Sequence, residues 1–188
     1  MSDTTTAPAA ADAATQAALE RLNTVIDRLI APDGCPWDST QTPESLTEYV
    51  IEECHELVDA IRSGKTADMV EELGDVAFLI LLIGKLMARA GGPSLADALE
   101  VEAAKMVRRH PHVFSDTTYE SQSEQLKDWD RIKREEKAAA DAEGPKGTYD
   151  SLPRGLPPLT KAYRIHAKAD RVGFTWPENE DVEKLSLI

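Results

Sequence analysis

Acidic side chains stand directly beside apolar ones in two segments of the sequence. The first segment, EECHELVDAI, contains Glu52, Glu53 and Glu56, and the second, EELGDVAFLILLIG, contains Glu72 and Asp75. Residues three or four positions apart share one face of an α-helix. If both segments are helical, each therefore places a row of carboxylates next to apolar side chains that the helix should bury.

Two such helices facing each other would bring four carboxylates together. Like charges at that distance raise one another's pKa and destabilise the fold unless a cation compensates them. Carboxylate oxygens suit Mg²⁺, with Mn²⁺ as a possible substitute, whereas zinc would require histidine and cysteine at a spacing that Cys54 and His55 do not offer. A solvated acidic surface is the alternative, but the second pair lies among Leu and Val. The pattern therefore favours a metal site, and Cys54 is interpreted as a core residue.

Helical periodicity and helix-breaking residues divide the chain into helices, and no segment alternates like a β-strand. The turn at Gly64 is short enough to make the helices on either side antiparallel neighbours. The predicted class is therefore all-α. The expected segments are a disordered tail at 1–15, helices at 16–30, 42–64, 66–90, 94–109, 121–142 and 158–171, and a linker rich in Pro and Gly after residue 144.

Composition limits the possible partners. The chain of 188 residues carries a formal net charge of −13, which disfavours a nucleic-acid polymer as partner. The longest apolar run, Val76 to Ile83, is too short to span a bilayer, and the first residues lack the pattern of a secretory signal. Two cysteines, Cys35 and Cys54, suit a reducing compartment. The expected location is the cytoplasm, without membrane association.

Several motifs together resemble one enzyme family. EExxE at 52–56 followed by ExxD at 72–75, with CPWDSTQT at 35–42, RRHPHVF at 108–114, WDRIKREEK at 129–137 and GFTW at 173–176, resembles the MazG-type nucleoside triphosphate pyrophosphohydrolases. The resemblance extends from about residue 19 to residue 177. It implies an all-α fold with a four-helix-bundle core, Mg²⁺-dependent cleavage of NTP or dNTP to a monophosphate and pyrophosphate, and a role in cleaning the nucleotide pool.

The resemblance also implies roles for individual residues and a domain organisation. Glu52 or Glu53 would orient or deprotonate the attacking water, and the sequence leaves that choice open. The catalytic domain would span 16–143, and 144–188 would be a linker and helical segment similar to the entry into a second domain. The implied metal ligands are Glu53, Glu56, Glu72 and Asp75, and the implied substrate-binding residues are Lys105, Arg109, Trp129, Lys133 and Trp37.

Other positions keep two interpretations. Trp37 could stack on a base or anchor its loop, and the anchor or loop clamp is slightly favoured. His110 and His112 could act as a ligand or an acid, but a structural turn with buried Val113 and Phe114 is favoured, because Pro111 ends the helix before it.

Three functions remain in competition. They are a MazG-type enzyme with loose base preference, a narrow dUTP or dCTP pyrophosphatase of the same superfamily, and a catalytically silent helical interaction module. The residues from Val76 to Ile83 are apolar on every face of their helix, so a homodimer or dimer of dimers is expected to bury Phe78 and Leu82 between subunits.

Overall fold

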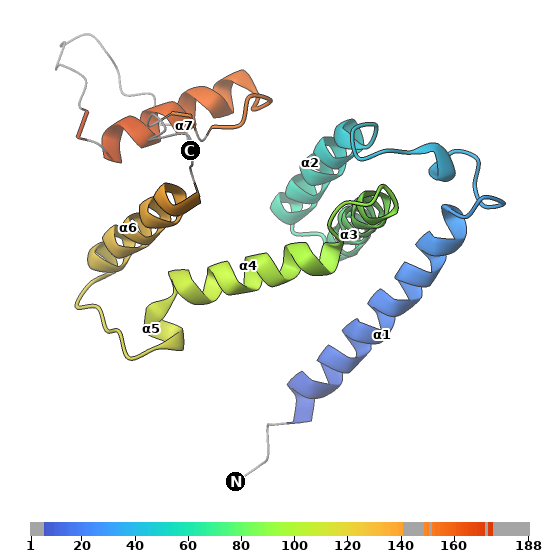
Figure 1. Cartoon of the computed structure of the whole chain (residues 1–188), viewed down its shortest axis with the longest axis horizontal. Helices are drawn as coiled ribbons and strands as arrows, with labels where there is room; N and C mark the ends of the chain where they lie inside the picture. Colours follow the sequence, from blue (N-terminus) through green and yellow to red (C-terminus); the bar gives the residue numbers. More distant parts are fainter. Residues whose placement is uncertain (1–5, 141–148, 151, 172, 175–188) are drawn as a thin grey trace. The chain divides into compact units, whose positions relative to one another are not determined.

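The structure is a computed structural model that describes residues 6–140, 149–150, 152–171 and 173–174. Within these ranges the chain forms helices and turns and contains no strand, which confirms the all-α class (Figure 1). No helix in this part of the chain is long and apolar enough to cross a membrane. In chain order the elements are α1 (Thr6–Leu29), the short 3₁₀ helix η1 (Asp38–Thr40), α2 (Thr47–Ser63), α3 (Thr66–Arg89), α4 (Leu95–Arg109), α5 (Pro111–Phe114), α6 (Gln122–Ala140) and α7 (Pro158–Arg171).

The chain divides into two compact units, Met1–Arg108 and Arg109–Ile188. The boundary between the two units lies inside the predicted catalytic domain, 16–143, so neither unit coincides with that domain. The domain boundaries stay a prediction.

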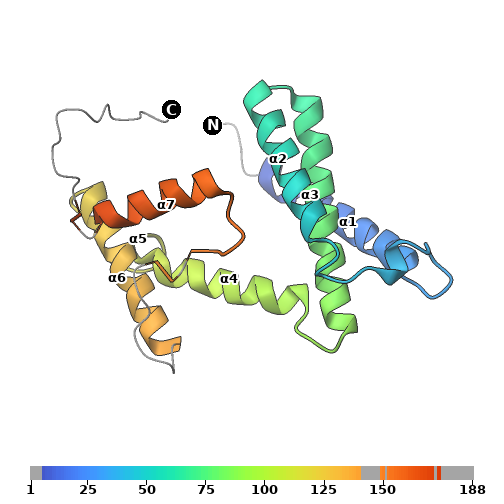
Figure 2. The ribbon, with the colours of Figure 1, turned by 90° about the horizontal axis from the view of Figure 1, so that it is seen from above.

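Helices α2 and α3 lie side by side and antiparallel in the first unit (Figures 1 and 2). Helix α2 ends at Ser63 and is capped by Gly64, which has φ 70° in the left-handed region and whose N–H donates to the carbonyl of Ile61 at 3.3 Å. Glycine adopts this conformation without a Cβ penalty. Because α3 begins at Thr66, the turn is short and the two helices must run back along each other, as predicted.

The core of this unit is made where α1 and α3 meet the segment before α2. Ile26, Leu46 and Leu82 are fully buried there, and Leu22, Val50, Phe78 and Leu95 pack around them. The backbones of α3 and α4 come close at Gly84, where an added Cβ would lie 2.7 Å from the Cβ of Leu95. This core holds α3 in place while its other side stays exposed.

Two predicted helix starts differ from the structure. Helix α1 begins at Thr6, so residues 6–15, predicted to be disordered, are helical. This segment is rich in alanine, the residue with the highest intrinsic helix propensity. Helix α2 begins at Thr47 instead of Thr42, because Thr42 and Ser45 accept hydrogen bonds from each other's backbone N–H groups at 3.2 and 3.0 Å and form a separate turn.

Predictions about burial on α2 and α3 also need correction. Leu82, expected between subunits, is fully buried in the core of its own chain, and Phe78 is half-buried against that core. Cys54, expected in the core, is exposed. The period of a helix predicts which residues share a face, but the packing of α1 against α3 decides which face is covered.

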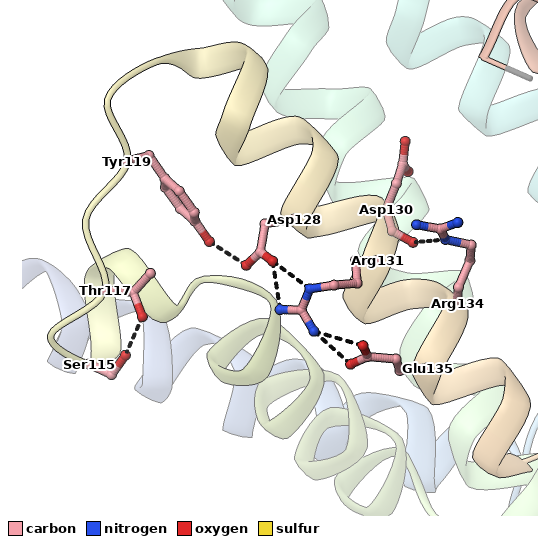
Figure 3. A network of polar contacts seen from close by, with 8 residues as sticks. All are labelled: Ser115, Thr117, Tyr119, Asp128, Asp130, Arg131, Arg134 and Glu135. Carbon is pink, nitrogen blue, oxygen red and sulfur yellow. Dashed lines mark hydrogen bonds and ion pairs between the residues drawn. The ribbon is translucent and has the colours of Figure 1, made fainter. Parts of the chain in front are cut away.

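The second unit is organised by polar contacts on α6 (Figure 3). Asp128 accepts hydrogen bonds from the Tyr119 hydroxyl at 2.6 Å and from Nε of Arg131 at 2.7 Å. Arg131 also donates to both carboxylate oxygens of Glu135 at 2.8 Å. At the start of α6, Oγ of Ser121 accepts from the N–H of Glu124 at 3.2 Å. Ser121 therefore caps the N-terminus of α6.

Other parts of this unit agree only in part with the expectations. Helix α7 spans Pro158–Arg171, as predicted for 158–171, whereas the predicted end of α6 at 142 lies outside the described residues. The turn at His110-Pro111 exists as α5, but Val113 and Phe114 are 63% and 59% exposed and not buried. A helix of one turn has too few positions to cover two large side chains.

Candidate metal and nucleotide site

The α2–α3 hairpin brings three predicted metal ligands together. Each of Glu53, Glu56 and Glu72 offers a carboxylate oxygen within 4.8 Å of the others. Glu53 and Glu56 are three residues apart on α2 and therefore share a face, and the antiparallel packing places Glu72 of α3 opposite them. Glu53 and Glu72 are half-buried and Glu56 is exposed, so the group lies at a surface open to a ligand.

The electrostatics of this group favour a cation. Desolvation, followed by the charges of Asp75, Glu56 and Glu52, raises the pKa of Glu53. Desolvation, followed by the charges of Glu56, Glu53, Glu71 and Asp75, raises the pKa of Glu72. In the described part of the chain, no ion pair joins a basic side chain to the three glutamates. Their negative charge is thus uncompensated by the protein itself.

Asp75 and Glu52 lie beside the three-residue group but do not belong to it. Both are exposed, and both are close enough to Glu53 for their charges to raise its pKa. Asp75 precedes a well-buried part of α3, one turn after Glu72. The ligand role of Asp75 and the water-orienting role of Glu52 or Glu53 stay predictions.

The donor atoms fit a hard divalent cation. Three carboxylate oxygens at this separation can share one Mg²⁺ or Mn²⁺, which prefer oxygen ligands. The neighbours Cys54 and His55 are exposed and take no part in the group. The arrangement can therefore hold a cation that in turn attracts a phosphate anion.

The predicted basic residues make intramolecular contacts. Lys105 forms an ion pair with Glu102, three residues earlier on α4. Arg109 donates from Nε and Nη2 to one carboxylate oxygen of Glu136 at 2.9 and 2.7 Å. Lys133 is half-buried on α6. Phosphate binding by Lys105, Arg109 and Lys133 stays a prediction.

Trp129 is the centre of an aromatic group in the second unit. The guanidinium carbon of Arg109 lies 5.7 Å from its ring centroid, and the ring of His110 lies 4.8 Å from it in an edge-on geometry. The rings of His110 and His112 are 5.7 Å apart. Nδ1 of His112 is buried and has no hydrogen-bond partner among the described residues. A role of these histidines as ligand or acid, or in a structural turn, stays a prediction.

Trp37 lies in the first unit, on the loop before α2. Trp37 is 47% exposed, and its ring makes a T-shaped contact with Tyr49, with centroids 5.6 Å apart and an interplanar angle of 89°. The next residue, Asp38, is buried, as is Leu46 directly before α2. Trp37 is thus partly open to solvent and also packs on Tyr49 of α2, and both interpretations, base stacking and loop anchor, stay predictions.

Sequence reasoning did not single out Tyr49 or Glu136. Tyr49 stands four residues before Glu53, so helical spacing could have placed it on the acidic face of α2. Glu136 contacts Arg109 across 27 residues, and local spacing carries no signal for a contact of that kind.

The comparisons with known proteins agree with the motifs. Residues 41–114 match the family described as the MazG nucleotide pyrophosphohydrolase domain. The chain is 37% identical to a nucleoside triphosphate pyrophosphohydrolase of Escherichia coli (strain K12) over 84% of this chain and 59% of that protein. It is also 37% identical to a nucleoside triphosphate pyrophosphohydrolase/pyrophosphatase MazG of Thermotoga maritima, over 87% of this chain and 61% of that protein. The chain thus spans about three fifths of the length of these two curated relatives.

A solved structure is matched over almost its whole length. The crystal structure of a mazG-related protein from Thermotoga maritima is 30% identical, with a TM-score of 0.53, and the match covers 61% of this chain and 98% of that one. Both the helical fold and nearly the full length of that protein are therefore represented here. The chain belongs to the MazG family.

Proposed function

We propose that this protein is a Mg²⁺-dependent nucleoside triphosphate pyrophosphohydrolase that releases a nucleoside monophosphate and pyrophosphate. The observation that carries the proposal is the convergence of Glu53, Glu56 and Glu72 within 4.8 Å across the α2–α3 hairpin. The names of the curated relatives support the same activity. Three carboxylates alone would repel a triphosphate, so the substrate must bind as a complex with cations.

The acidic residues divide into two roles, holding the cation and orienting the water. When bound, Mg²⁺ supplies positive charge to the phosphates and lowers the pKa of a coordinated water. Glu53, Glu56, Glu72 and, by its neighbouring position, Asp75 hold the cation. Glu52 lies outside the three-residue group, and this leaves its carboxylate able to orient the water or accept its proton, while Glu53 serves as a ligand.

Basic side chains would neutralise the phosphates of the substrate. Arg109 offers a planar fork to phosphate oxygens, and Lys105 and Lys133 act as point charges. Lys105 now pairs with Glu102, and Arg109 pairs with Glu136. Both basic side chains must exchange these carboxylates for phosphate when substrate binds. Trp129 would pack near the nucleoside.

We also propose a homodimer or a dimer of dimers. On α2 the exposed apolar residues Ile51, Val58 and Ile61 recur at helical spacing, and on α3 Val70, Leu73 and Ile80 do the same. An apolar surface of this kind on neighbouring helices is typical of an interface. A second copy, in the cytoplasm as the composition suggests, would cover it.

The test measures pyrophosphate and orthophosphate released from a panel of NTPs and dNTPs, with Mg²⁺ and with EDTA. We expect Mg²⁺-dependent pyrophosphate from several bases. Turnover confined to dUTP or dCTP would support the narrow-specificity alternative instead. No turnover of any nucleotide would contradict the enzymatic proposal and leave the silent interaction module.

A further inference from the structure

The ion pair of Arg109 with Glu136 is well shielded from water. Nε and Nη2 of Arg109 both donate to one carboxylate oxygen of Glu136, Oε2, at 2.9 and 2.7 Å. The two side chains are 17% and 21% exposed. On the same helix, Glu135 pairs with Arg131, and those side chains are 62% and 50% exposed. Because charge-assisted hydrogen bonds are strong and water does not compete freely for this pair, Glu136 holds Arg109 firmly.

The guanidinium of Arg109 offers little free surface to a further anion. Glu136 takes the edge formed by Nε and Nη2, which is an edge that arginine commonly presents to phosphate as a planar fork. Trp129 packs on the guanidinium, with its ring centroid 5.7 Å from the guanidinium carbon. His110 in turn holds the indole edge-on, at 4.8 Å between the ring centroids. A phosphate that binds Arg109 in the same way must therefore displace the carboxylate.

Sharing the guanidinium between both anions is unfavourable. A phosphate and the carboxylate of Glu136 would lie on one cation in a largely dehydrated place, where like charges repel strongly. Glu136 keeps 21% exposure, so its carboxylate can turn toward water when phosphate takes its place. The exchange lowers the apparent affinity for phosphate, because only molecules with an unpaired Arg109 are ready to bind it.

We propose that Glu136 competes with the phosphates of substrate and of pyrophosphate for Arg109, and that its return to Arg109 helps to release pyrophosphate. The inference rests on the proposed function and adds a residue that sets the affinity for the polyphosphate. Glu136 acts through Arg109 and makes no contact with substrate. The same carboxylate keeps Arg109 oriented on Trp129 while the site is empty.

Calorimetric binding of pyrophosphate in the presence of Mg²⁺ tests the competition without any turnover. Glu136→Gln keeps the shape of the side chain and one acceptor oxygen but removes the competing charge. Loss of charge from such a hydrogen bond corresponds to a factor of about 10 or more in an equilibrium. The variant is therefore expected to bind pyrophosphate roughly 10-fold more tightly. KM for ATP should fall in the same direction, and kcat should not rise, because pyrophosphate leaves more slowly.

Glu135→Gln is the matched control. It makes the same chemical change one residue away, where the carboxylate pairs with Arg131 (Figure 3), and it should bind pyrophosphate like the wild type. Glu136→Asp keeps the charge but withdraws it by one methylene, so its affinity should lie between those of the wild type and Glu136→Gln.

A double-mutant cycle shows whether Glu136 acts through Arg109. In the background of Arg109→Gln, the further change Glu136→Gln should leave the affinity for pyrophosphate as it is in Arg109→Gln alone. An equal gain in both backgrounds would indicate a general effect of net charge and would overturn the proposal. Thermal melting of each variant identifies any loss that comes from unfolding.

The outcomes separate this inference from the proposed function. Weaker or unchanged pyrophosphate binding in a folded Glu136→Gln protein would overturn the competition and make the ion pair a structural or positioning contact. If neither Glu136→Gln nor Glu136→Asp folds, or if no variant binds pyrophosphate, the competition is likewise rejected. If the wild type cleaves no nucleotide but Glu136→Gln binds pyrophosphate more tightly through Arg109, the proposed activity fails and the competition stands.

Discussion

The hydroxyl of Tyr119 donates a 2.6 Å hydrogen bond to Oδ2 of Asp128 and joins the segment before α6 to the middle of that helix (Figure 3). This bond, followed by the hydrogen bond from Arg131, lowers the pKa of Asp128. The same bond is the main cause of the raised pKa of Tyr119. Each group therefore stabilises the charge state in which the other is found near neutral pH.

We predict that Tyr119→Phe lowers the thermal stability of the protein at pH 7 and changes its pH dependence. The stability from a lowered carboxyl pKa is present above its ordinary value of 3.8 and is lost as the pH falls through the folded value. The stability from a raised phenol pKa is present below 10.0 and is lost as the pH rises through the folded value. The difference between wild type and variant should therefore shrink at both ends of a pH series of melting temperatures.

Tyr163→Phe is the control for this series, because Tyr163 is 59% exposed on α7. It should melt like the wild type throughout. A deficit of Tyr119→Phe that stays constant from acid to alkali would contradict the role of the hydrogen bond.

Gly84→Ala is predicted to destabilise the first unit. The new methyl group would lie 2.7 Å from the Cβ of Leu95, closer than side chains normally approach. Overpacking of this kind costs about 1–3 kcal/mol, which exceeds the roughly 1 kcal/mol that alanine contributes to helix propensity. Gly74→Ala on the same helix is the matched control, because a Cβ there meets no atom of the chain within 4 Å. Denaturant unfolding should give a higher free energy of unfolding for Gly74→Ala than for Gly84→Ala. The reverse order would show that Leu95 can move away from the new methyl group.

Glu56→Gln and Asp75→Asn should each lower kcat/KM by roughly 100-fold or more if both side chains are metal ligands. Each removes a negative charge from a crowded group, so the metal-free variants should be at least as stable as the wild type. Mn²⁺ binding measured by electron paramagnetic resonance should weaken in parallel with activity. Glu48→Gln, an exposed change at the start of α2, is the control. A variant with near wild-type turnover would remove that residue from the ligand set.

Comparing activity with Mn²⁺ affinity in variants of Glu52 and Glu53 assigns the water-orienting carboxylate. Glu52→Gln is expected to lower kcat while Mn²⁺ affinity stays close to that of the wild type, because Glu52 lies outside the three-residue group. Glu53→Gln is expected to weaken Mn²⁺ binding as well. Opposite results for the two variants would exchange the roles.

Hydrolysis in ¹⁸O-labelled water should place the label in the monophosphate. Attack at the α-phosphorus makes pyrophosphate the leaving group, whose developing charge is met by the cation and basic side chains. Mass spectrometry of both products is the measurement. Label in pyrophosphate would move the attack to the β-phosphorus, and orthophosphate as the first product would contradict a pyrophosphohydrolase.

The wild type is predicted to sediment as a dimer or tetramer at micromolar concentration. Ile80→Asp should shift it toward monomer, because Ile80 is 49% exposed on α3, a surface that we expect a second copy to cover. Leu159→Asp introduces the same chemical change at an 85% exposed position on α7 and should leave the assembly intact. A wild type that remains monomeric would exclude the proposed interface.

Local features of the sequence determined much of the fold. The left-handed turn at Gly64 and the start of α3 at Thr66 follow from the properties of glycine and from helical periodicity. The spacing of Glu53 and Glu56 determined that they share a face. These features depend on the few residues on either side of each position, so the sequence is sufficient to predict them.

Contacts between distant residues were decided by the tertiary structure. Leu82 is buried and Ile80 exposed although both belong to one apolar run, because only one side of α3 meets α1. Likewise, the pairing of Trp37 with Tyr49 depends on how a loop folds back onto α2. Helical periodicity specifies directions around a single axis, but the packing of several axes determines which directions meet a neighbour and which are left for a ligand or a second subunit.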